Sequence, residues 1–369
     1  MKKTLFIALF LASLMGPTLL YPLLKGRLDM ENYENRQLAA LPGLSLAELP
    51  AFPAEFEAYY DDHVPFKNFF VKAKTKLDME LLGESSIDSV TVGADHWMFY
   101  TVSVPGEDAL ADYQKTNLYP EEEMKRLGEE FSQVHQELKE RGIRFFQFEA
   151  PNKESVYGQY MPKRVKTFGE TSRLEALIPY LKENYGIPLY YLKDSLQPLA
   201  ETQQLYLKYD SHWNPLGAFV ASQQMAEVLV GSQVPLDAVE LVTEGTCSGD
   251  LARMLSLSAE YSDDPIYRIE GYLPEIEVTC LEEPDEKFAL YESNSPNDKT
   301  LLLVGDSFSQ FLKVYLPKLY RRSVFVTFDS YDPSLLEKYQ VDDFVYLTVE
   351  RNQRLFEETA EIVAEGDTE

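Results

Sequence analysis

Basic residues are scarce in this chain of 369 residues. Lysine and arginine number 34 against 61 aspartates and glutamates, which gives a formal net charge of −27. Such a surface repels the phosphate backbone, so a nucleic-acid-binding protein is excluded. The acidic excess also argues against nonspecific attraction to an anionic polymer. Hydrophobic residues make up 45% of the chain, enough for a sizeable core in one large domain or two smaller ones.

Cysteine and histidine are also scarce, with two and four residues. Neither forms a cluster with metal-ligand spacing, so we expect no metal and no cofactor. Cys247 and Cys280 fit an oxidising compartment, either as one disulfide or as two buried thiols. Four histidines leave few candidates for a catalytic base.

Charge is absent from one long run at the start. Met1-Lys2-Lys3 is followed by the apolar run Thr4 to Leu24, which Lys25 and Arg27 close. The run is long enough to span a bilayer, and a cleaved signal peptide is the alternative. No good small-residue cleavage pattern lies near its end, which favours an uncleaved anchor over residues 1–28. In both cases we expect a catalytic domain on the extracytoplasmic side of the cell membrane.

Residues 29–119 are predicted to form an N-terminal helical and hairpin extension packed on the main domain. Its polar start, Asp29 to Ser45, is typical of a linker. The stretch Leu46 to Phe70 predicts a helix that ends near His63. A short hairpin is expected over 90–100.

From about residue 120 to 369, helices and strands alternate, which predicts an α/β domain with a parallel sheet covered on both faces. The expected helices are Glu121 to Arg141, Ser172 to Tyr185, Pro215 to Leu229, Ser309 to Tyr320 and Arg354 to Ala364. The expected strands are Arg144 to Phe148, Leu189 to Leu192, Leu301 to Val304, Val324 to Phe328 and Phe344 to Val349. The stretch 236–299 breaks this alternation and predicts an insertion on one sheet edge, as a lid or an acceptor-binding surface.

One predicted strand leads directly into a candidate nucleophile. Leu301 to Val304 is followed by Gly305-Asp306-Ser307, and helical spacing follows the serine. Parallel sheets place active sites at the carboxyl ends of their strands, and a helix start there favours negative charge. A serine nucleophile needs this setting because its attack creates an oxyanion. A plain serine cap after a tight turn is the alternative.

A candidate base lies earlier in the chain. His212 precedes a predicted helix, and Asp210, two residues before it, can face the same way in an extended or turn backbone. A carboxylate there can fix the tautomer of the imidazole and stabilise its protonated form. An aspartate cap beside a buried histidine is the alternative. His63, His96 and His135 fit a helix end, a packing role and a helix surface.

Gly305-Asp306-Ser307 resembles the first block of the SGNH hydrolase superfamily, whose triad acid and base lie in a D-x-x-H-P block. Here the spacing is Asp-x-His and that segment precedes the serine. Both departures resemble one subgroup, the alginate O-acetylation proteins AlgJ and AlgX and the related family named for a D-H-H-W motif. Asp210-Ser211-His212-Trp213 stands in place of D-H-H-W. Further landmarks agree in order: Glu34-Asn35-Arg36, Asp62 to Lys67, Gly93, Trp97 to Tyr100, Pro151 to Tyr157, Met161-Pro162, Gly249-Asp250-Leu251 and Glu350-Arg351.

This resemblance implies an SGNH-like three-layer α/β/α fold and a serine acyl-enzyme. His212 would deprotonate Ser307, and Asp210 would orient His212. The Ser307 N–H is an expected oxyanion donor, and Asn152 is a candidate second donor or part of a plain turn. Tyr331, Arg351 and Trp213 are candidates for substrate binding. Surface or packing roles are the alternative for Tyr331 and Arg351.

The resemblance further implies a polysaccharide acceptor at the cell surface and a multipass membrane-bound O-acyltransferase as partner. Transfer to a sugar hydroxyl is therefore the predicted activity. An esterase with the same triad, which would use water as the acceptor, is one alternative. A non-catalytic polysaccharide-binding module, which would transfer no acetyl group, is the other. Triad geometry does not separate the transferase from the esterase, since they differ in how well the site excludes water and binds a sugar.

Overall fold

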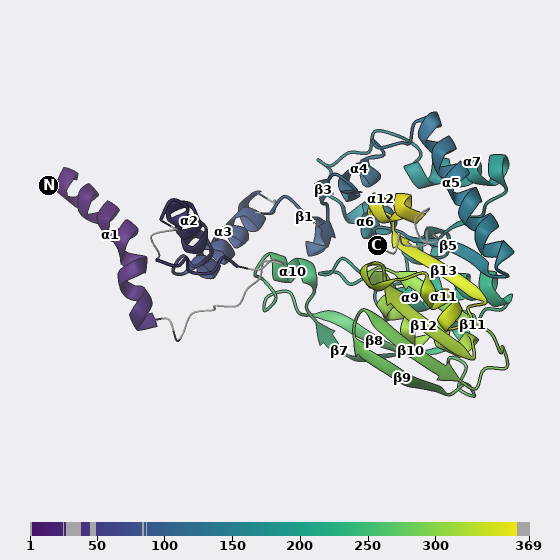
Figure 1. Ribbon diagram of the computed structural model, residues 1–369. Helices are drawn as coiled ribbons and strands as arrows, with labels where there is room; N and C mark the ends of the chain where they lie inside the picture. Colours follow the sequence, from purple (N-terminus) through teal and green to yellow (C-terminus); the bar gives the residue numbers. More distant parts are fainter. Residues whose placement is uncertain are drawn as a thin grey trace.

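The computed structural model describes residues 2–24, 26, 38–44, 49–82, 85 and 87–359 (Figure 1). The landmark Glu34-Asn35-Arg36 and most of the predicted linker 29–45 lie outside the described residues. The predicted domain boundaries after residues 28 and 119 stay predictions.

Among the described residues, three α-helices precede the first strand. They are α1 (Lys2–Leu24), α2 (Phe52–Asp62) and α3 (Lys67–Leu82). The end of α2 at His63 confirms the predicted helix end, whereas α3 was not expected from the sequence. Within the described ranges, no helix has both the length and the apolar character that crossing a membrane requires. The predicted transmembrane anchor is therefore not confirmed.

A seven-stranded sheet forms the centre of the fold, in the order β6-β5-β13-β11-β12-β10-β9 (Figure 1). The five strands from β6 to β12 run parallel, and β10 and β9 continue the sheet in antiparallel pairing. The strands are β5 (Arg144–Ala150), β6 (Leu189–Tyr191), β9 (Val278–Asp285), β10 (Phe288–Ser293), β11 (Thr300–Gly305), β12 (Arg322–Thr327) and β13 (Asp343–Val349). Each predicted strand of the α/β domain is present.

The two faces of the sheet are both buried. In β11, Leu301 and Leu303 belong to one apolar cluster, while Leu302 and Val304 belong to another on the opposite face. The first face packs against α9 (Pro215–Val230), and the second packs against α5 (Glu121–Glu140) and α11 (Ser334–Lys338). This burial on both faces confirms the predicted α/β fold with a mostly parallel sheet.

Local sequence signals set several helix ends as predicted. Ser172 caps α7 (Arg173–Tyr185) in a capping box with Glu175, and Gly186 ends the helix with a φ of 70°. Asn214 caps α9 by accepting the N–H of Gly217. The remaining short helices of the domain are α4 (Ala109–Gln114), α6 (Lys153–Tyr157), α8 (Lys193–Leu196), α10 (Asp250–Met254) and α12 (Gln353–Glu357).

The predicted helix Ser309 to Tyr320 is corrected. The segment forms two short 3₁₀ helices, η6 (Ser307–Val314) and η7 (Leu316–Leu319). Pro317 lies at the start of η7, where it supplies no N–H and its ring crowds the preceding turn, which disfavours one continuous α-helix over the segment. The predicted closing helix Arg354 to Ala364 is present as α12, and its residues from 360 onward lie outside the described residues.

The stretch 236–299 lies at the sheet edge, as predicted, and also extends the sheet. It supplies β9 and β10, together with a separate antiparallel pair, β7 (Glu240–Cys247) and β8 (Asp264–Glu270). Cys247 lies on β7 and Cys280 on β9, and both are free thiols, with Cys280 exposed. The extension before the main domain contains two more pairs, β1 (Val90–Val92) with β2 (Met98–Tyr100) and β3 (Ser103–Val104) with β4 (Glu107–Asp108).

Candidate active site

Ser307 lies at the carboxyl end of β11, between the ends of two neighbouring parallel strands. Asp306 holds the turn, because one carboxylate oxygen accepts the N–H of Phe308 at 3.0 Å and the other accepts the N–H of Val349 at 2.6 Å. Burial raises the pKa of Asp306 above its ordinary value, and these two backbone donors oppose the shift without cancelling it. Ser307 itself is exposed at the carboxyl ends of the parallel strands.

His212 lies in a closed loop that leads into α9. A bridge between Tyr206 and Trp213 closes the loop, and the N–H of Leu207 donates to the carbonyl of His212 at 3.1 Å. The cap of α9 at Asn214 then fixes the exit of the loop. The rings of Phe308 and Phe311 lie beside the imidazole, with centroids 5.0 and 6.0 Å away. These contacts hold His212 over the start of η6.

The three predicted triad residues form one hydrogen-bonded chain. Nδ1 of His212 lies 2.7 Å from Oδ1 of Asp210, and Nε2 lies 2.7 Å from Oγ of Ser307. In this arrangement Nδ1 donates to the carboxylate, which leaves Nε2 as the acceptor for the serine proton. A nucleophile, a base within hydrogen-bond reach and an orienting acid are therefore all in place.

Asp210 is held as a carboxylate. Its Oδ1 also accepts the N–H of His212 at 3.0 Å, and its Oδ2 accepts the N–H of Asp250 at 2.8 Å. Burial raises the pKa of Asp210, but the hydrogen bond and charge of His212 and these backbone donors outweigh burial and lower the pKa to about 2. The acid therefore stays ionised at neutral pH and well below it.

A family model described as an SGNH hydrolase-like domain, acetyltransferase AlgX, matches residues 90–327, which is more than half of the chain and contains the whole triad. The chain belongs to this AlgX-type SGNH family. It is 26% identical over 251 residues to a probable alginate O-acetylase AlgJ of Pseudomonas aeruginosa, a match over 62% of this chain and 59% of that protein. The chain thus matches about three fifths of the length of that curated relative.

Solved structures share the fold. Bacillus cereus PatB1 is similar with a TM-score of 0.51 and 14% identity, over 72% of this chain and 96% of that chain. A DHHW family protein from Eubacterium siraeum aligns with a TM-score of 0.49 and 16% identity, over 67% of this chain and 90% of that chain. The family model that matches residues 90–327 confirms the family expected from Asp210-Ser211-His212-Trp213 and Gly305-Asp306-Ser307.

Lys153 fixes the loop that carries the acid and base in this AlgX-type site. Its buried ammonium donates to three backbone carbonyls of the loop, those of Leu207 at 2.9 Å, Lys208 at 3.2 Å and Asp210 at 2.6 Å. Burial lowers the pKa of Lys153 to about 8, and nearby carboxylates, Asp210 first among them, oppose this shift. The amine is therefore charged at neutral pH, and it satisfies three carbonyls that are turned away from water.

The insertion braces the same loop from the other side. A Cβ atom on Gly249 would lie 2.3 Å from the carbonyl oxygen of Tyr209, so only glycine permits this close approach. The carboxylate of Asp264 accepts the N–H groups of Lys208 and Tyr209. The carboxylate of Asp250 accepts the N–H of Ser211 at 2.8 Å and its hydroxyl at 2.6 Å.

Asp250 brings a second carboxylate to His212. Its Oδ2 lies 3.8 Å from Nδ1 of His212, beyond the shorter contact from Asp210. Among the described residues, Asp210, His212 and Asp250 are the group of three whose ligand atoms lie close enough together to share a metal ion. The hydrogen bonds to Ser307, Ser211 and the backbone use these same atoms, and the expectation of no metal or cofactor stays a prediction.

Asn152 and Arg351 lie in a buried network beside the triad. The N–H of Asn152 donates to Glu350, its side-chain N–H₂ donates to Asp112 at 3.3 Å, and its side-chain oxygen accepts from Arg351 at 3.4 Å. The Arg351 guanidinium lies over the ring of Phe308 at 5.5 Å and is only 8% exposed. Asn152 thus joins separate segments, and its oxyanion role and the substrate contact of Arg351 stay predictions.

Two substrate-binding predictions are corrected. Trp213 is fully buried and packs edge-on against Phe308, so it has no surface to offer a substrate. Tyr331 packs on Phe344, at the start of β13 and on the opposite face of the sheet from Phe308. The chain turns back along that face after β12, which takes Tyr331 away from the strand end where Ser307 lies.

The other histidines lie outside the site. The Nδ1 atom of His63 lies 2.8 Å from the carbonyl of Tyr59 at the end of α2, and the exposed His96 lies beside the ring of Tyr261. His135 on α5 packs edge-on against Phe145, and burial lowers its pKa to about 4. None of these residues reaches a serine through a contact that the described structure records.

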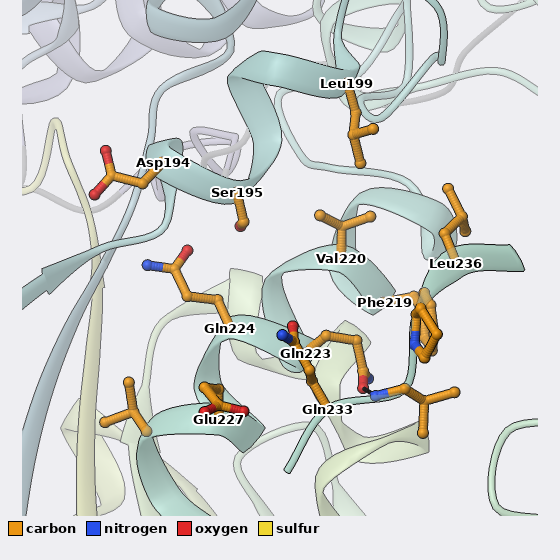
Figure 2. A pocket seen from close by; sticks show the side chains of 13 residues that line it. Asp194, Ser195, Leu199, Phe219, Val220, Gln223, Gln224, Glu227, Gln233 and Leu236 are labelled. Carbon is orange, nitrogen blue, oxygen red and sulfur yellow. Dashed lines mark hydrogen bonds between the residues drawn. The ribbon is translucent and has the colours of Figure 1, made fainter. Parts of the chain in front are cut away.

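A pocket of about 420 Å³ lies along α9 and contains none of the predicted site residues. Figure 2 shows the side chains that line it, with Gln223 bonded across one wall through the N–H of Val234 at 2.8 Å. The residues that line it come from α8, the following 3₁₀ turn at Leu199, α9 and the segment 233–236. It is therefore separate from the Ser307 site.

The sequence patterns did not single out Lys153, Asp250 and Asp264, which contact the loop that carries Asp210 and His212. The first two lie in segments that resemble family landmarks, Pro151 to Tyr157 and Gly249-Asp250-Leu251. Their charge inside these landmark segments was the signal that could have pointed to them. Asp264 carried no comparable signal, because it is one of many acidic residues in the insertion.

Proposed function

We propose that this protein is an O-acetyltransferase that passes an acetyl group through Ser307 to a hydroxyl of a cell-surface polysaccharide. The observation that carries the proposal is the hydrogen-bonded chain from Asp210 through His212 to the exposed Ser307. The family description, acetyltransferase AlgX, and the name of the relative, probable alginate O-acetylase AlgJ, support transfer of acetyl groups.

In the first half-reaction, Oγ of Ser307 attacks the carbonyl carbon of an acetyl ester while Nε2 of His212 takes the hydroxyl proton. The resulting oxyanion needs hydrogen-bond donors. The backbone N–H of Ser307 is suited to this role, because the described residues supply it with no hydrogen-bond partner. The tetrahedral intermediate then collapses, and the departing alcohol takes the proton from His212.

In the second half-reaction, a sugar hydroxyl attacks the acetyl-serine ester. Nε2 of His212 takes the proton of that hydroxyl and returns it to Oγ of Ser307 when the ester breaks. Asp210 stabilises the protonated imidazole in both halves. The products are an acetylated glycan and free Ser307, so protons and acetyl groups balance over the cycle.

We further propose that the site works outside the cytoplasm, with residues 1–28 as the targeting or anchoring segment and a membrane-bound O-acyltransferase as acetyl supplier. The apolar run Thr4 to Leu24 behind Met1-Lys2-Lys3 supports this location. An alkaline phosphatase fusion after residue 60 is expected to be active in cells, and a β-galactosidase fusion at the same point inactive. The reverse pattern would place the domain in the cytoplasm.

The transferase is tested with the purified protein, an activated acetyl ester and intact-mass and peptide mass spectrometry. We expect one added acetyl group on the peptide that contains Ser307, and its loss when a glycan acceptor is added. Ser307→Ala should remain unlabelled, whereas Ser309→Ala, which alters a buried hydroxyl two residues away, should be labelled if folded.

Three other outcomes would contradict the proposal. Acetylation at another residue would refute the role of Ser307. Rapid ester hydrolysis with no transfer to any glycan would indicate an esterase. Absence of labelling in a folded sample would favour a polysaccharide-binding module.

A further inference from the structure

Two hollows lie along η6 and share two lining residues, and one of the hollows lies near His212. The nearer one, of about 250 Å³, is lined by Pro215, Gln310, Phe311, Val314 and Tyr315. The Phe311 ring lies 6.0 Å from the His212 ring, so this hollow starts beside the base. None of its lining residues is charged.

The second hollow, of about 340 Å³, shares Val314 and Tyr315 with the first. Its other walls come from 268–272, Pro274 and Lys318. The shared residues make one surface, here called the acceptor groove, that runs from His212 along η6 towards the insertion. Val314 is 64% exposed within the groove and so offers an apolar contact surface there.

Both basic residues of the groove are already engaged. The guanidinium of Arg268 pairs with Glu244 and Glu270. The ammonium of Lys318 donates to the carbonyls of Tyr272 at 2.9 Å and Leu273 at 2.8 Å.

The cations that flank the groove are engaged as well. Lys313 pairs with Glu283 at 2.8 Å, and Arg351 near Ser307 contacts Glu107 at 3.3 Å. A polymer with one carboxylate on each sugar would meet cations that already have partners here, in a chain whose net charge is −27.

We infer that the acceptor groove binds an uncharged segment of a glycan chain and that a polyuronate is a poor acceptor for this protein. The inference rests on the proposed acetyl transfer to a polysaccharide and names the class of that polysaccharide. The C–H faces of neutral sugar rings match Phe311 and Val314, and the amide of Gln310 can pair with sugar hydroxyls. This acceptor class differs from alginate, which the relative's name mentions.

Binding measured without an acetyl donor tests the acceptor class independently of catalysis. Uncharged hexasaccharides of β-1,4-linked glucose and of N-acetylglucosamine, and a hexamannuronate, are titrated by calorimetry into the full-length protein at low salt. We expect at least one uncharged hexasaccharide to bind at least tenfold more tightly than the hexamannuronate. Equal or tighter binding of the hexamannuronate, or no binding of either uncharged sugar, would overturn the inference.

A matched pair of valine substitutions locates the binding surface. Val314→Lys places an unpaired cation in the groove and is expected to reduce the preference for the uncharged sugar at least threefold. Val104→Lys changes another exposed valine, 49% exposed on β3 and outside the groove, and should leave the preference unchanged. Equal effects of the two substitutions would refute the groove as the binding surface. Failure to acetylate Ser307, by contrast, would refute the proposed catalysis and leave these affinities as they are.

Discussion

Replacing His212 with alanine is expected to lower the rate of acetyl-enzyme formation by about 10³- to 10⁴-fold. The imidazole is the one group within hydrogen-bond reach of the Ser307 hydroxyl that the described structure records, at 2.7 Å. Without it the serine proton has no acceptor, so Oγ stays a weak nucleophile. The rate is measured by stopped-flow release of nitrophenolate from 4-nitrophenyl acetate.

The triad predicts a pattern of losses across variants. Asp210→Asn is expected to cause a loss close to that of His212→Ala, because the amide cannot fix the imidazole tautomer or stabilise its charge. Asp250→Asn should cause a smaller loss, since Asp250 lies 3.8 Å from Nδ1. The double variant of Ser307 and His212 should be no worse than either single variant, because the residues act as one unit.

His96→Ala is the matched control, since this exposed histidine lies outside the site, and it should retain full activity. Retention of more than a tenth of the activity in His212→Ala would refute the assignment of His212 as the base.

The acidic side of the pH profile follows from the same geometry. The pKa of Asp210 falls from an ordinary value of 3.8 to about 2 in the folded protein. The stability that this shift contributes is fully present above pH 3.8 and is lost as the pH falls towards 2. Activity lost near pH 5 or 6 therefore cannot come from protonation of Asp210, and a folded Asp210→Glu variant should show that loss at the same pH.

Replacing Lys153 with methionine is expected to destabilise the protein by about 3–5 kcal/mol and to reduce kcat in the fraction that still folds. Methionine keeps the unbranched shape and loses the ammonium that three loop carbonyls accept. Each buried carbonyl left without a donor costs about 1–3 kcal/mol, which partial relaxation of the loop offsets. Urea denaturation followed by tryptophan fluorescence measures the change in free energy of unfolding.

Lys125→Met is the control for the lysine substitution, since that side chain is largely exposed on α5, and its effect should stay within about 0.5 kcal/mol. If Lys153 positions the loop that carries Asp210 and His212, Lys153→Met should also lower kcat. This kcat is measured for acetyl-enzyme formation at saturating ester, in samples shown to be folded. Full stability and full kcat in Lys153→Met would show that the three carbonyls find other donors and that Lys153 does not position the loop.

The local signals in the sequence were sufficient for most elements. Short apolar runs between the helical patterns placed the five parallel strands, and Ser172 and Asn214 stand at the starts of α7 and α9. The prediction for the segment after Ser307 was wrong because helical spacing of apolar residues does not separate an α-helix from 3₁₀ turns. The exposed helix α3 was missed because it lacks a clear apolar face.

The predictions for the site residues also differ in how far the sequence supports them. Ser307, His212 and Asp210 follow from chemistry, because each side chain supplies what another needs. Trp213 and Tyr331 failed because proximity in sequence to a triad residue or to a strand end does not define the direction of a side chain. Lys153 and Asp264 escaped detection because their partners are backbone groups of a distant loop, and sequence does not show such contacts.

The order of the strands has a consequence for when this protein becomes a folded molecule. The central strands β11 and β13, with β12, all come from the last 70 residues of the chain, 300–369. Until these residues are synthesised, the β5–β6 pair and the β9–β10 pair have no common neighbour and no shared core. A growing chain therefore cannot complete the central sheet, or the turn that carries Ser307 at the end of β11, until residues 300–349 are made.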